Sequence, residues 1–265
     1  MAEAIIAGLL KRGLVRPEQI VGSHPREERR QELQEKFGIR LFESNREAVE
    51  NEDGRGSSIV MLTVKPQRLG TILRELKDGL GQDQLVISIV AGARIETVAD
   101  ELQHDAIVRA MPNTPAQIGE GMTVWTATPG VTEAQQVQIH AIFGSLGREL
   151  HVEEEKMIDM ATALSATGPT YIFLVMEALI DAGVHLGFSR HVAHELVLQT
   201  MLGSVLFARE SHKHPAELRD MVTSPGGTSA EAIYQMEKGS LRTVLSKAVW
   251  AAFQRATALG CKAKD

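Results

Sequence analysis

The stretch MVTSPGGTSAEAIYQME (residues 221–237) has the residue types and spacing that could bind a small anion. Pro-Gly-Gly predicts a tight turn, and Thr228 or Ser229 can begin the helix expected after it. Free amides and hydroxyls at a helix N-terminus form a concave site that favours a carboxylate. The groups that would form this site are the amides of Gly226, Gly227 and Thr228 and the hydroxyls of Ser224 and Ser229. An ordinary capped turn between two helices explains the same residues equally well.

A second polar stretch, VGSHPREERRQEL (residues 21–33), begins with a short apolar run that is expected to be a strand. In a dinucleotide-binding fold the second strand ends beside the adenosine ribose, where an Asp or Glu binds the 2′-hydroxyl of NAD. This chain places Ser23, His24 and Pro25 there, with several arginines just beyond. Because hydroxyl and basic donors fit a 2′-phosphate, the stretch favours NADPH over NADH. The alternative is a Ser23 helix cap before a solvated, charged helix.

Two further stretches place small or basic residues where strands are expected to end. LTVKPQ (residues 62–67) puts Lys65 at a strand end, with Pro66 at the first position of the next helix. SIVAGA (residues 88–93) ends in small residues, and Gly92 would permit the close approach of a flat ring or a phosphate. Each stretch is also explained as an ordinary strand exit.

The stretch RAMPNTPAQIGEGMT (residues 109–123) is more unusual, because two prolines flank Asn113-Thr114 immediately after an expected strand. This arrangement predicts a stiff, polar, exposed turn. Rigid loops at strand ends commonly carry substrate contacts. A plain connecting loop would have the same composition.

Secondary structure must position these stretches, and the first 155 residues alternate short apolar runs with amphipathic segments. The expected strands are Gln19–Gly22, Ser58–Thr63, Leu85–Val90, Ala106–Met111 and Met122–Trp125. The expected helices are Arg26–Lys36, Gln67–Leu76, Ile95–Leu102 and Thr132–Ser145, with a further helix from residue 1 that ends at Gly13. Continuous apolar strands are typical of a parallel sheet covered on both faces. The alternation predicts a Rossmann-like, doubly wound α/β domain over residues 1–155.

After Glu153 the strand patterns stop and the remaining chain is predicted to be helical, forming a second domain over residues 156–265. The expected helices are Met157–Leu186, His191–Arg209, Ala216–Met221, Thr228–Lys238 and Leu241–Leu259. Gly168 and Pro169 should break or kink the first of them.

Composition restricts the function further. The net charge of −6 over 265 residues argues against a general nucleic-acid binder, and no apolar run approaches the roughly 20 residues of a membrane span. A single cysteine, Cys261, forms neither an internal disulfide nor a cysteine metal site, so a cytoplasmic setting is expected. His191 and His194 share a helix face without a matching acid, so no metal is predicted. Hydrolase and kinase motifs are absent from the sequence.

Taken in order, TVKP, the glycine-containing strand end, AMPNTPAQIGEGMT, ATGPTY and VTSPGGTS resemble the pyrroline-5-carboxylate reductases of proline biosynthesis. The resemblance spans essentially the whole chain, and it implies hydride transfer from NAD(P)H to the C=N carbon of 1-pyrroline-5-carboxylate. It implies that Ser229, where the family usually has Thr, places its hydroxyl beside the imine nitrogen. It also implies a homodimer, or a higher homo-oligomer, formed by the helical domain. Ala166, Thr167 and Thr170 depart from the family's usual smaller residues.

The same resemblance implies two sets of binding residues. The substrate carboxylate would be held by Ser224, Gly226, Gly227, Thr228 and Ser229. The coenzyme, with NADPH preferred, would be bound by Ala2, Ser23, His24, Pro25, Asn45, Thr63, Val64, Lys65, Pro66, Ile89, Val90, Ala91 and Asn113.

The largest departure lies at the N-terminus. Family members begin with a strand and a Gly-x-Gly-x-x-Ala loop. In this sequence Ala2 matches the final alanine of that loop. The first strand and both loop glycines are therefore expected to be missing from the given sequence. Three hypotheses follow: a working reductase whose given sequence starts late, a non-catalytic homologue that acts as a dimeric binding or structural protein, or a related imine or hydroxyacid reductase. The SPGG block argues against the last.

Overall fold

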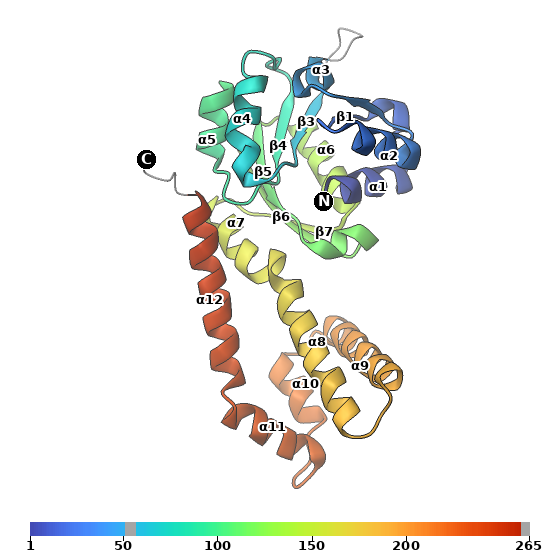
Figure 1. Cartoon of the computed structure of the whole chain (residues 1–265). Coiled ribbons are helices and arrows are strands. Elements are labelled where there is room, and N and C mark those ends of the chain that lie inside the picture. Colours follow the sequence, from blue (N-terminus) through green and yellow to red (C-terminus); the bar gives the residue numbers. More distant parts are fainter. Residues whose placement is uncertain (51–56, 261–265) are drawn as a thin grey trace. The chain divides into compact units, whose positions relative to one another are not determined.

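A computed structural model describes residues 1–50 and 57–260 of the chain; Cys261 lies outside the described residues. The chain divides into two compact units, one formed by residues 1–169 with 252–265 and the other by residues 170–251. The predicted domain boundary at residues 155 and 156 therefore falls within the first unit. Figure 1 shows the strands gathered in the first unit and the second unit built from helices.

The first unit contains two sheets. In the smaller sheet β1 (Val21–Ser23) pairs in parallel with β2 (Arg40–Phe42). The five-stranded sheet has the order β3-β4-β5-β6-β7. Its strands are β3 (Ile59–Leu62), β4 (Leu85–Ser88), β5 (Ile107–Met111), β6 (Gly121–Ala127) and β7 (Gly147–His151). Among the described residues β1 pairs only with β2 and β3 only with β4, so β1 and β3 are both edge strands.

All the helices of the first unit except Asn45–Glu50 lie where the sequence predicts a helix. They are α1 (Ala2–Lys11), α2 (Glu27–Phe37), α3 (Asn45–Glu50), α4 (Pro66–Leu76), α5 (Ile95–Leu102), α6 (Glu133–Gly144) and α7 (Lys156–Ala161). The Thr132–Gln135 capping box of α6 forms, and Gly13 after α1 has a φ of 64°. The doubly wound α/β prediction is confirmed.

The sheet is not parallel throughout, which corrects one part of the prediction. β3, β4 and β5 are parallel, but β6 is antiparallel to β5 and parallel to β7. The connection between β5 and β6 covers residues 112–120 and contains only the short 3-10 helix Thr114–Ile118. Because a parallel crossover needs a dozen residues or more, this connection reverses the chain instead.

Helices cover both faces of the five-stranded sheet, as Figure 1 shows. Leu85 and Ile87 of β4 pack on one face with Ile5 of α1 and Phe143 of α6, and neither β4 side chain is exposed. Val86, the residue between them, packs on the other face in a cluster that includes Leu73 of α4. The alternation along β4 therefore attaches α1 and α6 to one face and α4 and α5 to the other.

Two strands and one α-helix are absent from the sequence prediction: β2, β7 and α3. β2 and α3 are short, with 3 and 6 residues, and β7 (Gly147–His151) has no buried position. Short elements, and a strand with no continuous apolar run, have a weak periodic signal.

A polar cluster surrounds Trp125, a buried residue of β6. Its Nε1 donates to Glu149 Oε2 at 2.6 Å, and the His140 ring is within hydrogen-bond distance of Glu149 Oε1 at 2.8 Å. Burial by itself would raise the pKa of Glu149. The hydrogen bonds from Trp125 and His140, with the charges of His140 and His151, outweigh it and hold the pKa below the ordinary value of 4.5.

The second unit is helical, as predicted. Its elements are α8 (Gly168–His185), α9 (Arg190–Ser211), α10 (Pro215–Met221), α11 (Thr228–Lys238) and α12 (Leu241–Gly260), of which α8 begins and α12 ends in the first unit. The predicted break at Gly168-Pro169 is confirmed: a π-helical turn, Thr162–Ala166, separates α7 from α8, and Pro169 lies in the first turn of α8. Proline is tolerated there because the first amides of a helix have no partner.

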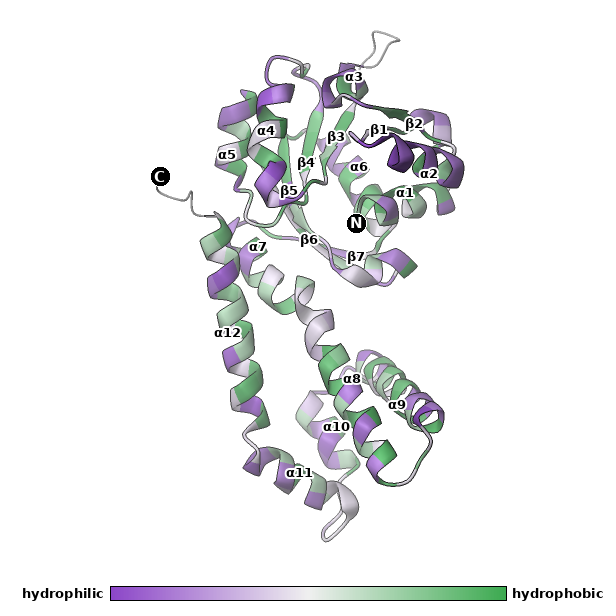
Figure 2. Cartoon of the chain, in the orientation of Figure 1, coloured by the Kyte–Doolittle hydropathy of each residue, from purple (hydrophilic) through white to green (hydrophobic). Residues whose placement is uncertain are grey.

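Large apolar side chains are exposed on the second unit, and Figure 2 shows hydrophobic residues along α8 and α9. Among those at least half exposed are Ile172, Phe173, Leu174, Leu196, Leu202, Val205, Phe207 and Trp250. An exposed apolar surface of this extent is typical of a protein interface.

The prediction that no apolar run approaches a membrane span needs correction. By length and composition Lys156–His185 is apolar enough to cross a membrane. Only 6% of its most apolar 18-residue stretch is buried in the structure. The segment includes the interrupting π-helical turn and lies at the start of the exposed apolar surface described above.

Candidate functional site

The residues after β3 and β4 offer mainly backbone groups. Ile89 continues the pairing of the strands, because its N–H donates to Leu62 O at 3.2 Å. Val90 is 2% exposed and packs in the core, so only its backbone could face a ligand. Lys65 is exposed and precedes α4, which begins at Pro66 as predicted. Thr63, Val64 and Ala91 are half-buried.

Gly92 permits a close approach, but by a segment of this chain. Its φ is 76°, and a Cβ atom there would lie 2.7 Å from the backbone of Leu259 near the end of α12. The prediction that Gly92 makes room for a ring or a phosphate is therefore not supported in this structure. The glycine is needed where α12 meets the loop after β4.

Polar side chains converge where β1 ends. Ser23 Oγ donates to Asn45 Oδ1 at 2.6 Å, and Asn45 Nδ2 donates to Glu75 Oε2. Ser23 ends β1, Asn45 begins α3, and the exposed Glu75 lies in the last turn of α4. Two of the predicted coenzyme residues are thus brought together. Glu75, 30 residues along the chain from Asn45, is a partner of this pair that the sequence analysis did not single out.

The basic residues beyond β1 are not equally available to a phosphate. Arg29 binds Glu3 and Glu32, while Arg30 donates to the carbonyl oxygens of His24 and Pro25 at 2.8 and 3.1 Å. His24 Nδ1 accepts from the Arg26 N–H at 3.2 Å, which leaves Nε2 as the donor of the neutral ring. His24 Nε2 and Arg26 are therefore better placed than Arg29 to meet a 2′-phosphate.

Ala2 is the first residue of α1 and lies where the helix amides have no helical partner. Glu3 in the same turn binds Arg29 and Lys36 of α2. The hydrogen bonds and charges of these two residues lower the pKa of Glu3 despite the opposing effect of burial, with the Lys36 hydrogen bond the largest cause. The start of α1 is thus fixed against α2, with its first amides directed out of the helix.

Asn113 uses its side chain within the chain. Its Oδ1 accepts from the Met122 N–H at 2.8 Å, and its Nδ2 lies 3.4 Å from both the carbonyl oxygen and Oγ of Ser165. These contacts join the loop after β5 to β6 and to the π-helical turn. Asn113 therefore holds this loop in place, and a coenzyme contact from it stays a prediction.

Arg109 is the first residue of the 109–123 stretch singled out in the sequence. It is the centre of an ion-pair network that the sequence analysis did not predict. It is 2% exposed in the middle of β5. Its Nη1 donates to Glu155 Oε1 at 2.8 Å and its Nη2 to Asp159 Oδ1 at 2.6 Å. Glu155 Oε1 also accepts from the Ile95 N–H at 2.9 Å. The network attaches α7 to β5 and to the start of α5.

The glycine-rich turn of the second unit joins α10 to α11 as predicted. Gly226 has a φ of 71°, and the Gly227 N–H donates to Ser224 O at 3.0 Å. A Cβ atom at Gly227 would lie 2.5 Å from Ser224 Oγ, so a larger residue here would displace the Ser224 hydroxyl. Gly227 caps α11, which begins at Thr228, and the first amides of α11 therefore face out of the helix beside the turn.

A pocket of about 330 Å³ opens beside this turn and is lined by Asp220, Thr223, Ser224, Pro225 and Ala230. Ser229 lies in the first turn of α11, next to Ala230. Asp220, which pairs with Arg219 at 2.8 Å, gives this pocket a carboxylate that sequence reasoning did not single out.

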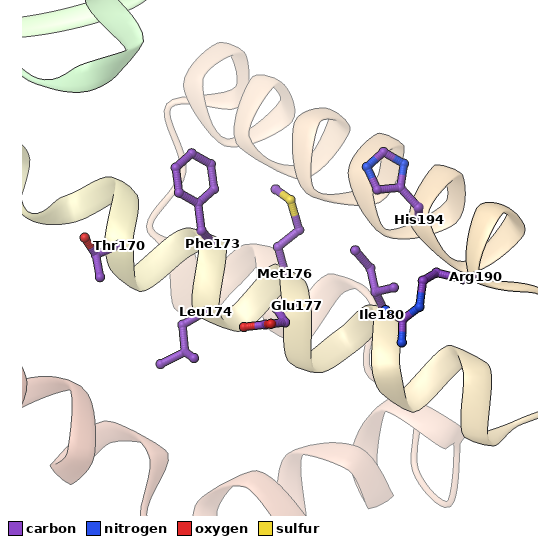
Figure 3. Close-up of a pocket in the computed structure, with 8 residues that line it drawn as sticks. All are labelled: Thr170, Phe173, Leu174, Met176, Glu177, Ile180, Arg190 and His194. Carbon is purple, nitrogen blue, oxygen red and sulfur yellow. The ribbon is translucent and has the colours of Figure 1, made fainter.

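A larger groove of about 610 Å³ lies between α8 and α9 in the second unit. Figure 3 shows Phe173 and Met176 projecting from α8 toward α9. The lining is mostly apolar, with Glu177, Arg190 and His194 as its charged or titratable members. Phe173 is 58% exposed, so the groove is an open surface.

These observations define a class of protein. A doubly wound α/β unit with polar groups at its strand ends, together with a helical unit that carries an amide-lined turn, is the architecture of a nicotinamide-dependent oxidoreductase. Residues 1–92 match the family model of NADP oxidoreductase, coenzyme F420-dependent, and residues 155–259 match that of pyrroline-5-carboxylate reductase dimerisation.

Individual relatives agree with these models. A pyrroline-5-carboxylate reductase of Synechocystis is 40% identical over 99% of this chain and 96% of its own length, and one of Arabidopsis thaliana is 38% identical over 98% and 92%. The crystal structure of the Plasmodium falciparum pyrroline carboxylate reductase with NADP bound has a TM-score of 0.88. It is 32% identical in sequence, and the match covers 98% of this chain and 94% of that one. The structure of a Coxiella burnetii pyrroline-5-carboxylate reductase also has a TM-score of 0.88. It is 36% identical in sequence, over 98% of this chain and 95% of that one.

The chain belongs to the pyrroline-5-carboxylate reductase family, which confirms the resemblance stated from the sequence. This family comprises NAD(P)H-dependent oxidoreductases that act on a C=N bond. A structure of prephenate dehydrogenase from Aquifex aeolicus, at 17% identity and a TM-score of 0.51, shares the fold alone.

Proposed function

We propose that this chain reduces 1-pyrroline-5-carboxylate to proline with a hydride from NAD(P)H, the last step of proline biosynthesis. The observation that carries the proposal is the 36–40% identity to proteins named pyrroline-5-carboxylate reductase over 98–99% of this chain. The polar groups at the end of β1 and the free amides at the turn before α11 support the proposal, since they would provide the two kinds of binding group that the reaction requires.

The chemistry asks for positioning and one proton donor. Bound NAD(P)H supplies the hydride, while the protein orients the substrate and stabilises its changing charge. The amides around Gly226, Gly227 and Thr228 would hold the substrate carboxylate, helped by the positive end of the α11 dipole. The Ser229 hydroxyl would donate to the imine nitrogen as the hydride reaches the adjacent carbon.

The residues at the end of β1 fit a nicotinamide dinucleotide. Ser23 and Asn45 offer a hydroxyl and an amide for the ribose, and His24 Nε2 and Arg26 offer donors for a 2′-phosphate. The free amides at the start of α1, which include that of Ala2, suit the pyrophosphate. On this basis we propose NADPH as the preferred coenzyme, with further contacts from residues 63–66, 89–91 and 113.

The second unit supports assembly of this chain with itself. The matched dimerisation region covers the helices that expose large apolar side chains, including the groove between α8 and α9. We propose a homodimer, or a higher homo-oligomer, in the cytoplasm. Its proposed partners are the small substrate and other copies of this chain, without nucleic acid, a membrane or a metal.

The decisive test is oxidation of the coenzyme, followed with 1-pyrroline-5-carboxylate as substrate and with NADPH and NADH in parallel. We expect substrate-dependent loss of nicotinamide absorbance, equimolar formation of proline, and a lower KM for NADPH. A folded, dimeric chain that produces no proline at saturating coenzyme would contradict the proposal.

Among the described residues the β1–β2 pair is not joined by strand pairing to the five-stranded sheet. A chain that carries a parallel strand and a Gly-x-Gly loop ahead of Ala2 would join the two sheets and supply pyrophosphate amides. We expect that longer chain to unfold at higher temperature and to bind NADPH more tightly. Equal affinity of the two chains would show that the extra strand is not needed.

A further inference from the structure

The hydrogen-bond chain Ser23–Asn45–Glu75 connects the end of β1 to a negative charge on α4. Each of its three side chains comes from a different element: β1, α3 and α4. Ser23 and Asn45 are half-buried, whereas Glu75 is exposed. The chain therefore runs from the proposed ribose position outward to solvent, with a carboxylate at its outer end.

The carboxylate fixes the direction of every hydrogen bond in this chain. A carboxylate only accepts, so Asn45 must present its Nδ2 amino group to Glu75. Asn45 Oδ1 then faces Ser23, and the Ser23 hydroxyl must donate to it, at 2.6 Å. Ser23 thus presents lone pairs, and not its proton, to a ligand. One Nδ2 hydrogen of Asn45 remains available as a donor.

This arrangement treats the two coenzymes differently. The 2′-hydroxyl of NADH can donate to Ser23 Oγ and accept from Asn45, so it uses the pattern as it stands. The 2′-phosphate of NADPH carries only acceptors that face the site, so Ser23 must release Asn45 before it can donate. A phosphate that reaches Asn45 also lies one amide group away from the Glu75 carboxylate, and like charges at that separation repel.

We propose that Glu75 is a specificity-determining residue for the coenzyme, and that its carboxylate, acting through Asn45, limits the preference for NADPH over NADH. The donors His24 Nε2 and Arg26 favour the 2′-phosphate, and Glu75 opposes them. The inference rests on the proposed binding of the coenzyme adenosine at the end of β1. It does not require the reductase reaction itself.

The test compares 2′,5′-ADP with 5′-ADP, which differ only in the 2′-phosphate, by calorimetric titration of the full chain. Glu75→Gln removes the charge but keeps an acceptor for Asn45, and Glu75→Ala removes both. Glu101→Gln, on the exposed face of α5, makes the same change in net charge elsewhere. In the native chain the Glu75 carboxylate and the 2′-phosphate, two like charges, would lie within several ångströms of each other. We therefore expect Glu75→Gln to raise the preference for 2′,5′-ADP over 5′-ADP about fivefold or more.

The expected results separate charge from geometry. Glu75→Gln and Glu75→Ala should both raise the preference, Glu101→Gln should leave it unchanged, and the effect should shrink in high salt. The same ranking should appear in the dissociation constants of NADPH and NADH. An unchanged ratio in Glu75→Gln, with both nucleotides bound, overturns the role of Glu75 and leaves the coenzyme site standing.

Two other outcomes are equally decisive. If only Glu75→Ala alters the ratio, the orientation of Asn45 matters and the charge does not, which overturns the proposal. A native chain that binds neither nucleotide overturns both the site and the role of Glu75. If the ratio shifts as expected but no proline forms, the assignment of Glu75 stands and the proposed reaction falls.

Discussion

Replacing Arg109 with methionine should destabilise the first unit strongly. The substitution removes two charge-assisted hydrogen bonds, at 2.8 and 2.6 Å, and leaves the carboxylates of Glu155 and Asp159 without the cation that they share. Each such bond contributes roughly 1.5–3 kcal/mol, and breaking a buried pair costs about 3–5 kcal/mol. Glu155 is 31% exposed and keeps the Ile95 N–H, which reduces the penalty. We therefore expect a loss of about 3 kcal/mol.

Urea and thermal unfolding measure this loss. A decrease of about 3 kcal/mol corresponds to a fall in Tm of roughly 6–12 °C for a unit of this size. Arg148→Met, on the exposed β7, is the matched control, and we expect its effect to stay within about 0.5 kcal/mol. A double-mutant cycle with Asp159→Asn should show a coupling of about 1 kcal/mol or more. A loss below about 1 kcal/mol for Arg109→Met, or a coupling of zero, would refute the reasoning.

Three further predictions concern side chains with defined local roles. Ser229→Ala should lower kcat by about 10²-fold or more through loss of the proton donor, while Ser229→Thr should retain activity; equal kcat in Ser229→Ala and the native chain would contradict this role. Gly227→Ala should raise the KM for the substrate, because its Cβ would lie 2.5 Å from Ser224 Oγ and would displace that hydroxyl; an unchanged KM would show that the Ser224 hydroxyl does not hold the substrate. Glu149→Gln should destabilise the chain at neutral pH. Because the folded-state pKa of Glu149 is lowered, its stabilisation is present above the ordinary value of 4.5 and disappears as the pH falls through the folded value. The difference in Tm between native and Glu149→Gln chains should therefore shrink with acidification, and a constant difference would contradict the assignment.

The sequence predicts those elements that have a continuous periodic pattern. α5 and α11 have the predicted limits, and β3, β4 and β5 lie within or close to theirs. The reversal of β6 was not predicted, because the apolar run of Met122–Trp125 is the same in a parallel and an antiparallel strand. What distinguishes them is the length of the connection after β5, which is too short for a parallel crossover.

Site residues divide along a similar line. The turn with Ser224, Gly226 and Gly227 has a local signature, and the structure places it at the start of α11 as predicted. Asn45 was identified only through the family resemblance, and Glu75 by no signal at all, since a hydrogen bond across 30 residues leaves no local pattern. Arg109 did have a signal: a lone arginine within the apolar strand IVRAM requires acidic partners.

The β1–β2 pair is attached to the rest of the first unit by helices and side chains, since no strand of the described residues joins it to β3. Contacts of α3 with both β1 and α4 supply one attachment, and Glu3 on α1, bound to Arg29 and Lys36 on α2, supplies another. Packing of Ile5 in the core then fixes α1 to the five-stranded sheet.

The Ser23–Asn45–Glu75 chain belongs to the same set of attachments, because it spans β1, α3 and α4. A ligand that binds Ser23 and Asn45 therefore interacts with groups that also hold β1 in place. Binding of the coenzyme adenosine and the local stability of the β1–β2 pair should consequently be coupled, with each increasing the other. A change at Glu75 affects both the binding of the adenosine and the local stability of the β1–β2 pair. Because 2′,5′-ADP and 5′-ADP share the adenosine, the ratio of their affinities isolates the effect of Glu75 on the 2′-phosphate.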